Sequence, residues 1–169
     1  MAVLNHDHLF EQADKLIASP PAGPPRQVDL RRAISSAYYG VFHYMLTAAA
    51  DEFVGVTKKN TNRYTLVYRS IDHRDLRELC METKKQTLTA KYQKFAPANG
   101  FGENIQAFAS TFVELQEKRN SADYDPSSRM KTSDASLAIA TARDAVGRFQ
   151  KASAPRRKAF LDLLLFSPR

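Results

Sequence analysis

The sequence predicts an all-α domain, and three observations lead to that class. Apolar residues recur at helical spacing through most of the 169 residues. No segment carries a recognisable strand signal. The chain also lacks a glycine-rich phosphate loop and any cluster of cysteine and histidine at metal-ligand spacing. We therefore expect one domain over residues 1–169, built as an up-and-down helical bundle, with no metal or other cofactor.

The first two helices are predicted from apolar spacing on either side of a proline-rich stretch. The first contains Leu9, Phe10, Ala13, Leu16 and Ile17. It stops at SPPAGPP, because proline cannot continue a helix, and residues 19–27 are interpreted as a linker. The second runs from about residue 28 to about residue 50. Its uncharged stretch is long enough to span a membrane, but its serines, tyrosines and His43 indicate a buried helix of a soluble protein.

Four further helices are predicted after a loop at residues 55–63. One covers residues 64–81 with a bend around 70–72, and an irregular connection at 91–102 follows it. The next begins near residue 103 and ends before Pro126. Another has Thr132 or Ser133 as its N-cap and continues to about residue 151. Pro155 opens the last, at residues 156–166 within the C-terminal segment 152–169, and its apolar residues should pack on the bundle: Leu161, Leu164, Leu165 and Phe166.

Composition favours a cytoplasmic protein with no membrane partner. Cys80 is the only cysteine, so no internal disulfide can form, which fits a reducing compartment. The N-terminal stretch MAVLNHDHLFEQ lacks the basic start and apolar core of a signal peptide. The net charge of +7 attracts polyanions, but the lysines and arginines are spread over several short groups. The charge alone therefore does not define a nucleic-acid surface.

The helix that ends before Pro126 has an apolar face that turns polar in its last turns. Its apolar stripe consists of Ile105, Phe108, Phe112 and Leu115. The same stripe continues to Arg119 and Asp123, which are four residues apart and can touch. An inward charge needs a partner or a ligand. The pair is either a structural tie to neighbouring helices or part of a binding site.

The second helix has two populated faces. One is apolar, and the other carries polar residues at i, i+4, i+7 and i+11: Arg32, Ser36, Tyr39 and His43. No lysine, arginine, aspartate or glutamate occurs between Arg32 and Asp51. A helix without charge all round is buried on more than one side. We therefore expect either the central helix of the domain or part of a subunit interface.

Two motifs resemble those of the HEPN superfamily. RRAISSAYYGVFHYM in the second helix is similar to the family's signature helix, and EKRNSADYD is similar to its terminal arginine motif. The resemblance implies a dimer-forming bundle of four to six helices, with a cleft where the two arginine motifs meet. It implies catalytic roles for Arg119, Asn120, Asp123 and Tyr124. It leaves the polar stripe Arg32, Ser36, Tyr39 and His43 as ligand-binding or interface residues.

The resemblance also bears on activity, because many HEPN proteins are metal-independent ribonucleases neutralised by a small nucleotidyltransferase. In those enzymes an arginine binds the phosphate, and a histidine separated from it by four to six intervening residues accepts the proton of the 2′-hydroxyl. Here Arg119 and Asn120 match, but Asp123 stands in place of the histidine and one residue too early. A free aspartate has a pKa of about 3.9, and a neighbouring arginine lowers it further, so it is a weak base at neutral pH.

The expected function is therefore a homodimer that binds a phosphate-bearing ligand, RNA or a nucleotide, with weak or no catalysis. It would be one component of a toxin–antitoxin-type pair, with a nucleotidyltransferase antitoxin as its partner. One alternative is an active metal-independent ribonuclease in which His43, Tyr124 or Asp123 replaces the missing histidine. The other is a non-catalytic protein interaction module in which Arg119 and Asp123 are structural.

Overall fold

The computed structural model describes residues 3–18 and 23–168, and these residues form eight α-helices, one 3-10 turn and no strand. The all-α class is therefore confirmed. The helices are α1 (His6–Ile17), α2 (Gln27–Phe53), α3 (Asn62–Arg69), α4 (His73–Thr83), α5 (Ala90–Gln93), α6 (Gly102–Tyr124), α7 (Thr132–Lys151) and α8 (Ala154–Leu165), with the 3-10 turn η1 (Val56–Lys58). The expected number of four to six is too low. The predicted helix 64–81 is divided into α3 and α4, and one turn, α5, forms in the connection expected to be irregular.

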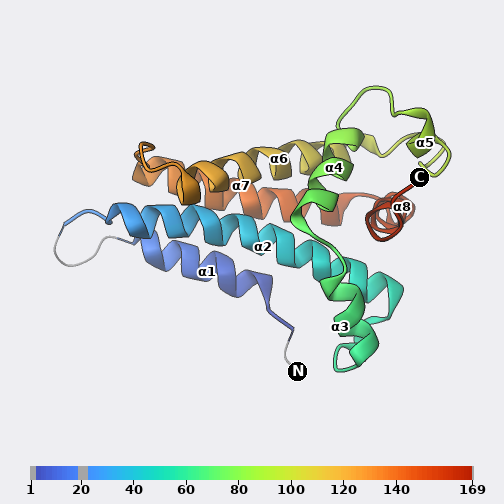
Figure 1. Ribbon diagram of the computed structural model, residues 1–169, viewed down its shortest axis with the longest axis horizontal. Coiled ribbons are helices and arrows are strands. Elements are labelled where there is room, and N and C mark those ends of the chain that lie inside the picture. The colour runs from blue at the N-terminus through green and yellow to red at the C-terminus, as the bar shows by residue number, and fades with distance from the viewer. Residues whose placement is uncertain (1–2, 19–22, 169) are drawn as a thin grey trace.

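Four helices form the body of the molecule. Figure 1 shows α1, α2, α6 and α7 side by side along its length, with chain direction reversing from α1 to α2 and from α6 to α7. Helix α2 is the longest and contacts α1, α3, α6, α7 and α8. It is therefore the central helix, which explains why it avoids charge after Arg32. No helix in the ranges 3–18 and 23–168 combines the length and apolar character needed to cross a membrane.

Helix α1 packs closely on α2 because α2 has a glycine at the crossing point. A Cβ atom at Gly40 would overlap the ring of Phe10, which is buried between the two helices. Glycine in the middle of a helix is usually unfavourable. At this position the absence of a side chain makes room for an aromatic ring that the core needs.

Two helix starts differ from the sequence prediction. The chain breaks after Arg69 and restarts at His73 because Asp72 and Asp75 cap each other. The Asp75 N–H donates to the Asp72 carboxylate at 2.8 Å, and the Asp72 N–H donates to the Asp75 carboxylate at 3.4 Å. Helix α7 has Lys131 as its N-cap, so the predicted caps Thr132 and Ser133 are wrong. The Lys131 N–H donates to the Asp134 carboxylate at 2.8 Å, which fixes the earlier start.

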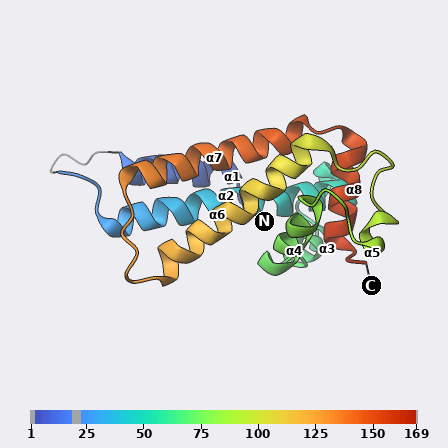
Figure 2. The same cartoon turned by 90° about the horizontal axis from the view of Figure 1, so that it is seen from above.

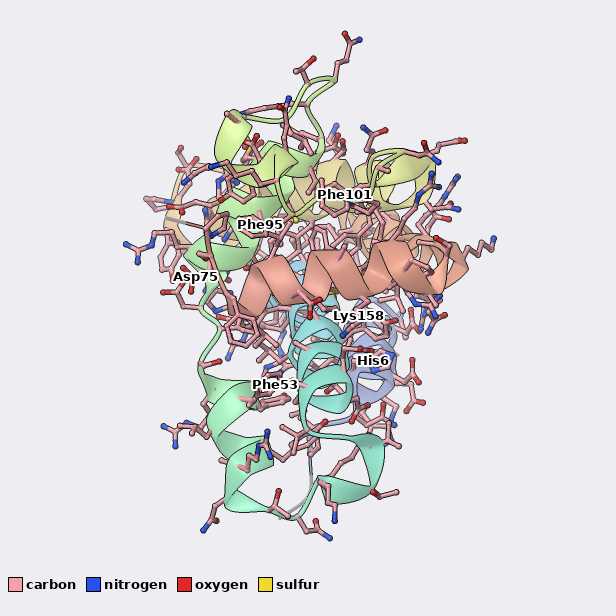
Figure 3. All side chains as sticks on the ribbon, turned by 90° about the vertical axis from the view of Figure 1, so that its right-hand side faces the viewer. His6, Phe53, Asp75, Phe95, Phe101 and Lys158 are labelled. Atoms are coloured by element: carbon pink, nitrogen blue, oxygen red, sulfur yellow. The ribbon has the colours of Figure 1, made fainter. Side chains whose placement is uncertain are left out.

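Helix α8 closes one end of the bundle. Figure 2 shows α3, α4, α5 and α8 gathered at that end, and Figure 3 shows α8 crossing in front of the end of α2. Leu161 and Leu164 are buried, as the apolar pattern predicted. Phe166 is not: 58% of it is exposed, and its ring packs edge-on against that of Phe53 at the end of α2.

A candidate anion site around Arg119

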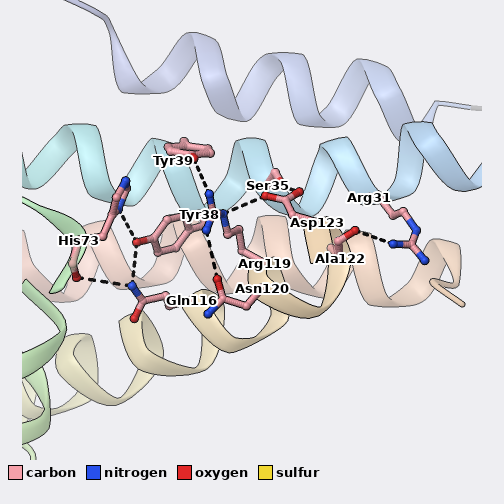
Figure 4. A network of polar contacts seen from close by, with 10 residues as sticks. All are labelled: Arg31, Ser35, Tyr38, Tyr39, His73, Gln116, Arg119, Asn120, Ala122 and Asp123. Carbon is pink, nitrogen blue, oxygen red and sulfur yellow. Dashed lines mark hydrogen bonds and ion pairs between the residues drawn. The ribbon is translucent and has the colours of Figure 1, made fainter. Parts of the chain in front are cut away.

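Arg119 and Asp123 form an ion pair on the face of α6 that looks toward α2. Arg119 Nε lies 2.9 Å from Asp123 Oδ2, and their side chains are only 15% and 18% exposed. The other carboxylate oxygen of Asp123 accepts a hydrogen bond from the Ser35 hydroxyl on α2. The contact predicted from the four-residue spacing is therefore present, and Ser35 links it to the central helix. Figure 4 shows these groups together.

The guanidinium of Arg119 is surrounded by tyrosines. Its Nη2 donates to the Tyr39 hydroxyl at 2.7 Å, and its Nη1 donates to Asn120 Oδ1 at 3.1 Å. Its Cζ lies 5.7, 5.3 and 5.2 Å from the ring centroids of Tyr38, Tyr39 and Tyr124. Such contacts stabilise a cation over aromatic faces.

The electrostatic balance keeps Arg119 charged. Burial acts to lower the pKa of its guanidinium, but the Tyr39 hydroxyl and the Asp123 carboxylate outweigh burial and raise that pKa above its ordinary value. The Nε–H is buried and has no acceptor at hydrogen-bond geometry. The contact with Asp123 is therefore an ion pair that leaves this N–H unsatisfied.

A second polar network lies one turn earlier on α6. Gln116 Nε2 donates to the Tyr38 hydroxyl at 3.3 Å and to the His73 carbonyl at 3.4 Å. The same hydroxyl lies 2.7 Å from His73 Nδ1, and Arg77 donates to Gln116 Oε1 at 3.1 Å. Burial raises the pKa of Tyr38 well above its ordinary value, so the hydroxyl stays protonated. This network was not predicted from the sequence, although Gln116 lies three residues before Arg119 on the same inward side of the helix.

Arg31 holds the end of α6 in place. Its Nη1 donates to the carbonyls of Ala122 at 2.7 Å and Asp125 at 3.0 Å, and its Nη2 donates to the Ser128 carbonyl. The last carbonyls of a helix lack partners within the helix, and a cation beside them also complements the helix dipole. Arg31 therefore fixes the turn that presents Asp123. Sequence reasoning missed it, because Arg31 and Arg32 are adjacent and nothing local indicates which one points inward.

The turn after α6 is itself held by hydrogen bonds. The Asp125 carboxylate accepts from Ser127 and Ser128, with both hydroxyl contacts at 2.6 Å. The Ser127 and Ser128 hydroxyls, helped by the Ser127 N–H, lower the pKa of Asp125 to about 2. This turn is where Arg31 finds two of its three carbonyl partners, so the loop and the helix end are fixed as one unit.

The predicted polar stripe of α2 is divided among different neighbours. Tyr39 joins Arg119, but the Ser36 hydroxyl donates to Gln12 of α1 at 3.3 Å. His43 Nδ1 lies 2.6 Å from the Tyr68 hydroxyl of α3. Arg32 is exposed and pairs with no residue in the described ranges. Residues that share one side of a central helix thus meet different helices along its length.

The remaining predicted residues lie at the open side of the arginine. Asn120 is exposed, and Tyr124 is 69% exposed while its ring still contacts the guanidinium. Within residues 3–18 and 23–168, no group of three or more histidine, cysteine, aspartate or glutamate side chains could hold a metal ion. The site therefore offers one cation, hydroxyl and amide groups and aromatic faces.

Acid should destabilise the fold through its half-buried histidines. Burial lowers the pKa of His6 and His43, and burial together with Arg119 lowers that of His73, from the ordinary value of 6.5. The unfolded chain then binds protons before the folded chain does. The contribution of these histidines to the free energy of unfolding is at its maximum above pH 6.5. It decreases as the pH falls below 6.5 and stops changing once the pH is below the lowered pKa values of the folded state.

The measurement is urea denaturation between about pH 7 and pH 5. The midpoint should move to lower urea concentration as the pH falls, and His43→Gln should reduce that movement. The comparison should use the change with pH and not the absolute midpoint, because the substitution itself alters packing. A midpoint that stays constant over this range would contradict the expected titration.

No family model matches the sequence, and neither a curated protein nor a solved structure does. The geometry around Arg119 and the two motifs of α2 and α6 are therefore the features that bear on function.

Proposed function

We propose that the protein is a HEPN-like homodimer whose Arg119 site binds a phosphate-bearing ligand, RNA or a nucleotide, with weak or no catalysis. The observation that carries the proposal is the guanidinium held among three tyrosines beside the exposed Asn120 and Tyr124. An arginine has more N–H donors than the contacts with Tyr39 and Asn120 use, and its planar fork suits a phosphate.

The geometry favours binding over cleavage because no free base lies at the arginine. Both oxygens of Asp123 are engaged, one by Ser35 and one by Arg119. Taking up a proton from a ligand would require Asp123 to give up contacts with its charged form. His43, another residue considered for this role, has its Nδ1 2.6 Å from the Tyr68 hydroxyl of α3.

The dimer and the partner belong to the same proposal. Tyr124 and Asn120 are exposed at the end of α6, where the HEPN resemblance implies that two arginine motifs meet. A second copy of the chain would cover this surface and complete a cleft around two guanidinium groups. In a toxin–antitoxin-type pair, the nucleotidyltransferase partner would act on or near this cleft. Light scattering should report a dimer, and a monomer at micromolar concentration would contradict this part of the proposal.

The test of ligand binding is Arg119→Lys. Lysine keeps the positive charge beside Asp123 but lacks the bidentate fork, so we expect a folded protein that binds about tenfold less tightly. Binding of labelled single-stranded RNA and of ATP should be measured by fluorescence anisotropy and calorimetry. Arg32→Lys makes the same change at an exposed position and should leave binding unchanged. Equal affinities for the two variants would contradict the proposal.

One observation favours a second candidate, the non-catalytic interaction module. Ser35, Asp123 and Arg119 together tie α6 to α2, which is what a purely structural pair would do. In that case Arg119→Lys would lower stability and no RNA or ATP binding would be found in the parent protein. The ribonuclease alternative is tested by Asp123→His, for which we expect no gain of RNA cleavage because both the residue and its spacing differ from the catalytic motif.

A further inference from the structure

His73 lies beside the arginine site although it comes from a different helix. It is the first residue of α4, and its ring centroid is 5.7 Å from that of Tyr39, whose hydroxyl accepts from Arg119. Its ring also stacks on Phe42 with centroids 3.9 Å apart. Figure 4 shows the side chains of His73, Tyr38, Tyr39 and Arg119 near one another, with His73 and Arg119 on either side of Tyr38. Packing therefore holds the imidazole in one orientation near the guanidinium.

The hydrogen bonds of Tyr38 decide which ring nitrogen of His73 carries the proton. Gln116 donates to the Tyr38 hydroxyl, so the hydroxyl directs its own proton to His73 Nδ1. We assign the neutral imidazole a proton on Nε2 for this reason. Nε2 has no partner within the described residues and is not a buried unsatisfied atom, so it reaches solvent. His73 thus offers an N–H donor to solvent close to Arg119.

We infer that His73 is a second anion-binding group of the Arg119 site, so that the site takes a ligand with at least two phosphate groups. The inference rests on the proposed function and narrows it. Arg119 binds one phosphate through its fork, and His73 Nε2–H donates to the next. Successive phosphates of an RNA strand and the polyphosphate of a nucleotide share this chemistry, whereas a nucleoside monophosphate does not.

The second group makes binding depend on pH. His73 faces Tyr38, Tyr39 and His43 of α2 and Arg119 of α6, with Asp72 next to it in its own chain segment. Burial, and after it Arg119, lowers the pKa of His73, while Asp72 acts in the opposite direction. A phosphate bound next to the ring favours the imidazolium. Affinity should therefore increase as the pH falls below the ordinary histidine range.

The experiment measures binding of a short single-stranded oligouridylate at about pH 7.5 and about pH 5.5, each over a series of salt concentrations. Its phosphodiesters do not titrate in this range, so a change with pH comes from the protein. The parent protein should bind about tenfold more tightly at the lower pH, because the charged imidazolium replaces the neutral imidazole as the hydrogen-bond donor to the phosphate. The slope of log affinity against log salt should become steeper by about 0.7 for one added cation.

His73→Gln is the informative variant, because glutamine keeps a neutral N–H donor and cannot gain a proton. It should fold, bind as the parent does at about pH 7.5, and lose both the gain in affinity and the steeper slope at about pH 5.5. His8→Gln removes an exposed histidine of α1 and should behave as the parent protein. Circular dichroism at both pH values shows whether each variant is folded.

The source of the phosphates is resolved at about pH 7.5 with ATP and AMP as probes. His73→Leu should weaken ATP by about tenfold and leave AMP within a factor of about two. If His73→Leu instead loses RNA binding and keeps ATP binding, the ligand is a nucleic-acid strand. If Arg119→Lys loses binding but His73→Gln keeps the full pH response, the inference is overturned and the proposed function stands. If the parent protein binds neither RNA nor ATP, the proposed function fails and the inference fails with it.

Discussion

Replacing Phe160 with alanine should lower the free energy of unfolding by about 3–5 kcal/mol. Phe160 is fully buried at the centre of an aromatic cluster. Its ring contacts those of Phe101, Phe108 and Phe149 edge-on, with centroids 6.2, 5.8 and 5.7 Å apart. The truncation removes these contacts and leaves a cavity that three fixed rings cannot close. Urea denaturation monitored by circular dichroism measures the loss.

Phe166→Ala is the matched control, because it makes the same chemical change a few residues later. Phe166 is 58% exposed and packs its ring against that of Phe53, so its loss should cost less than about 1 kcal/mol. Two variants of similar stability would mean that α8 does not pack on the bundle through Phe160. Phe160 contacts α6 at Phe108, which lies about three helical turns before Arg119, so the folded fraction of either variant should keep its affinity for RNA or ATP.

Arg31→Leu should cost about 2–4 kcal/mol, because hydrogen bonds from a charged group to three carbonyls are lost together. The effect should not stop at stability. The carbonyl of Ala122 lies in the last turn of α6, so freeing it loosens the turn that carries Asp123. We expect weaker binding of RNA or ATP than in the parent protein, even under conditions where the variant is folded.

Arg32→Leu provides the control for this prediction, since it removes the same charge one residue later. Arg32 is exposed and pairs with no described residue, so its replacement should change stability by less than about 0.5 kcal/mol. The stability of Arg31→Lys should lie between those of the two leucine variants. Lysine keeps the charge, but its ammonium lacks the planar fork with which arginine reaches three carbonyls. If Arg31→Leu and Arg32→Leu were equally stable, the carbonyl contacts would contribute nothing measurable.

Local patterns were sufficient to predict the main helices. The absence of charge after Arg32 indicated a central helix, and α2 occupies that place. The break between α3 and α4 was underestimated as a bend, although the reciprocal cap of Asp72 and Asp75 is visible in the sequence as an aspartate three residues after another. The early start of α7 has a similar cause. The backbone N–H of Lys131 donates to the Asp134 carboxylate, so no serine or threonine hydroxyl is needed as the N-cap.

The candidate site was predictable only where it follows one helix. The contact between Arg119 and Asp123 spans a single turn, so spacing alone indicated it. The contact between Tyr38 and His73 joins residues 35 positions apart, and Arg31 reaches Asp125 across 94 positions. Helical periodicity says which side of a helix a residue occupies and not which neighbour it meets. Contacts between residues on different helices could therefore be identified only from the packing of the helices in the structure.

Asp123 has a consequence for how the arginine can be used. A carboxylate attached four residues from Arg119 acts as a tethered competitor for any anion that arrives from solution. Its effective concentration at the guanidinium is on the order of millimolar or higher, as for any group joined by a short linker. A free anion with one point of attachment displaces the carboxylate only when its own concentration in solution exceeds this effective concentration. If the site binds anions as proposed, we expect it to favour ligands with two points of attachment, because a ligand held at a second point is also tethered near the guanidinium.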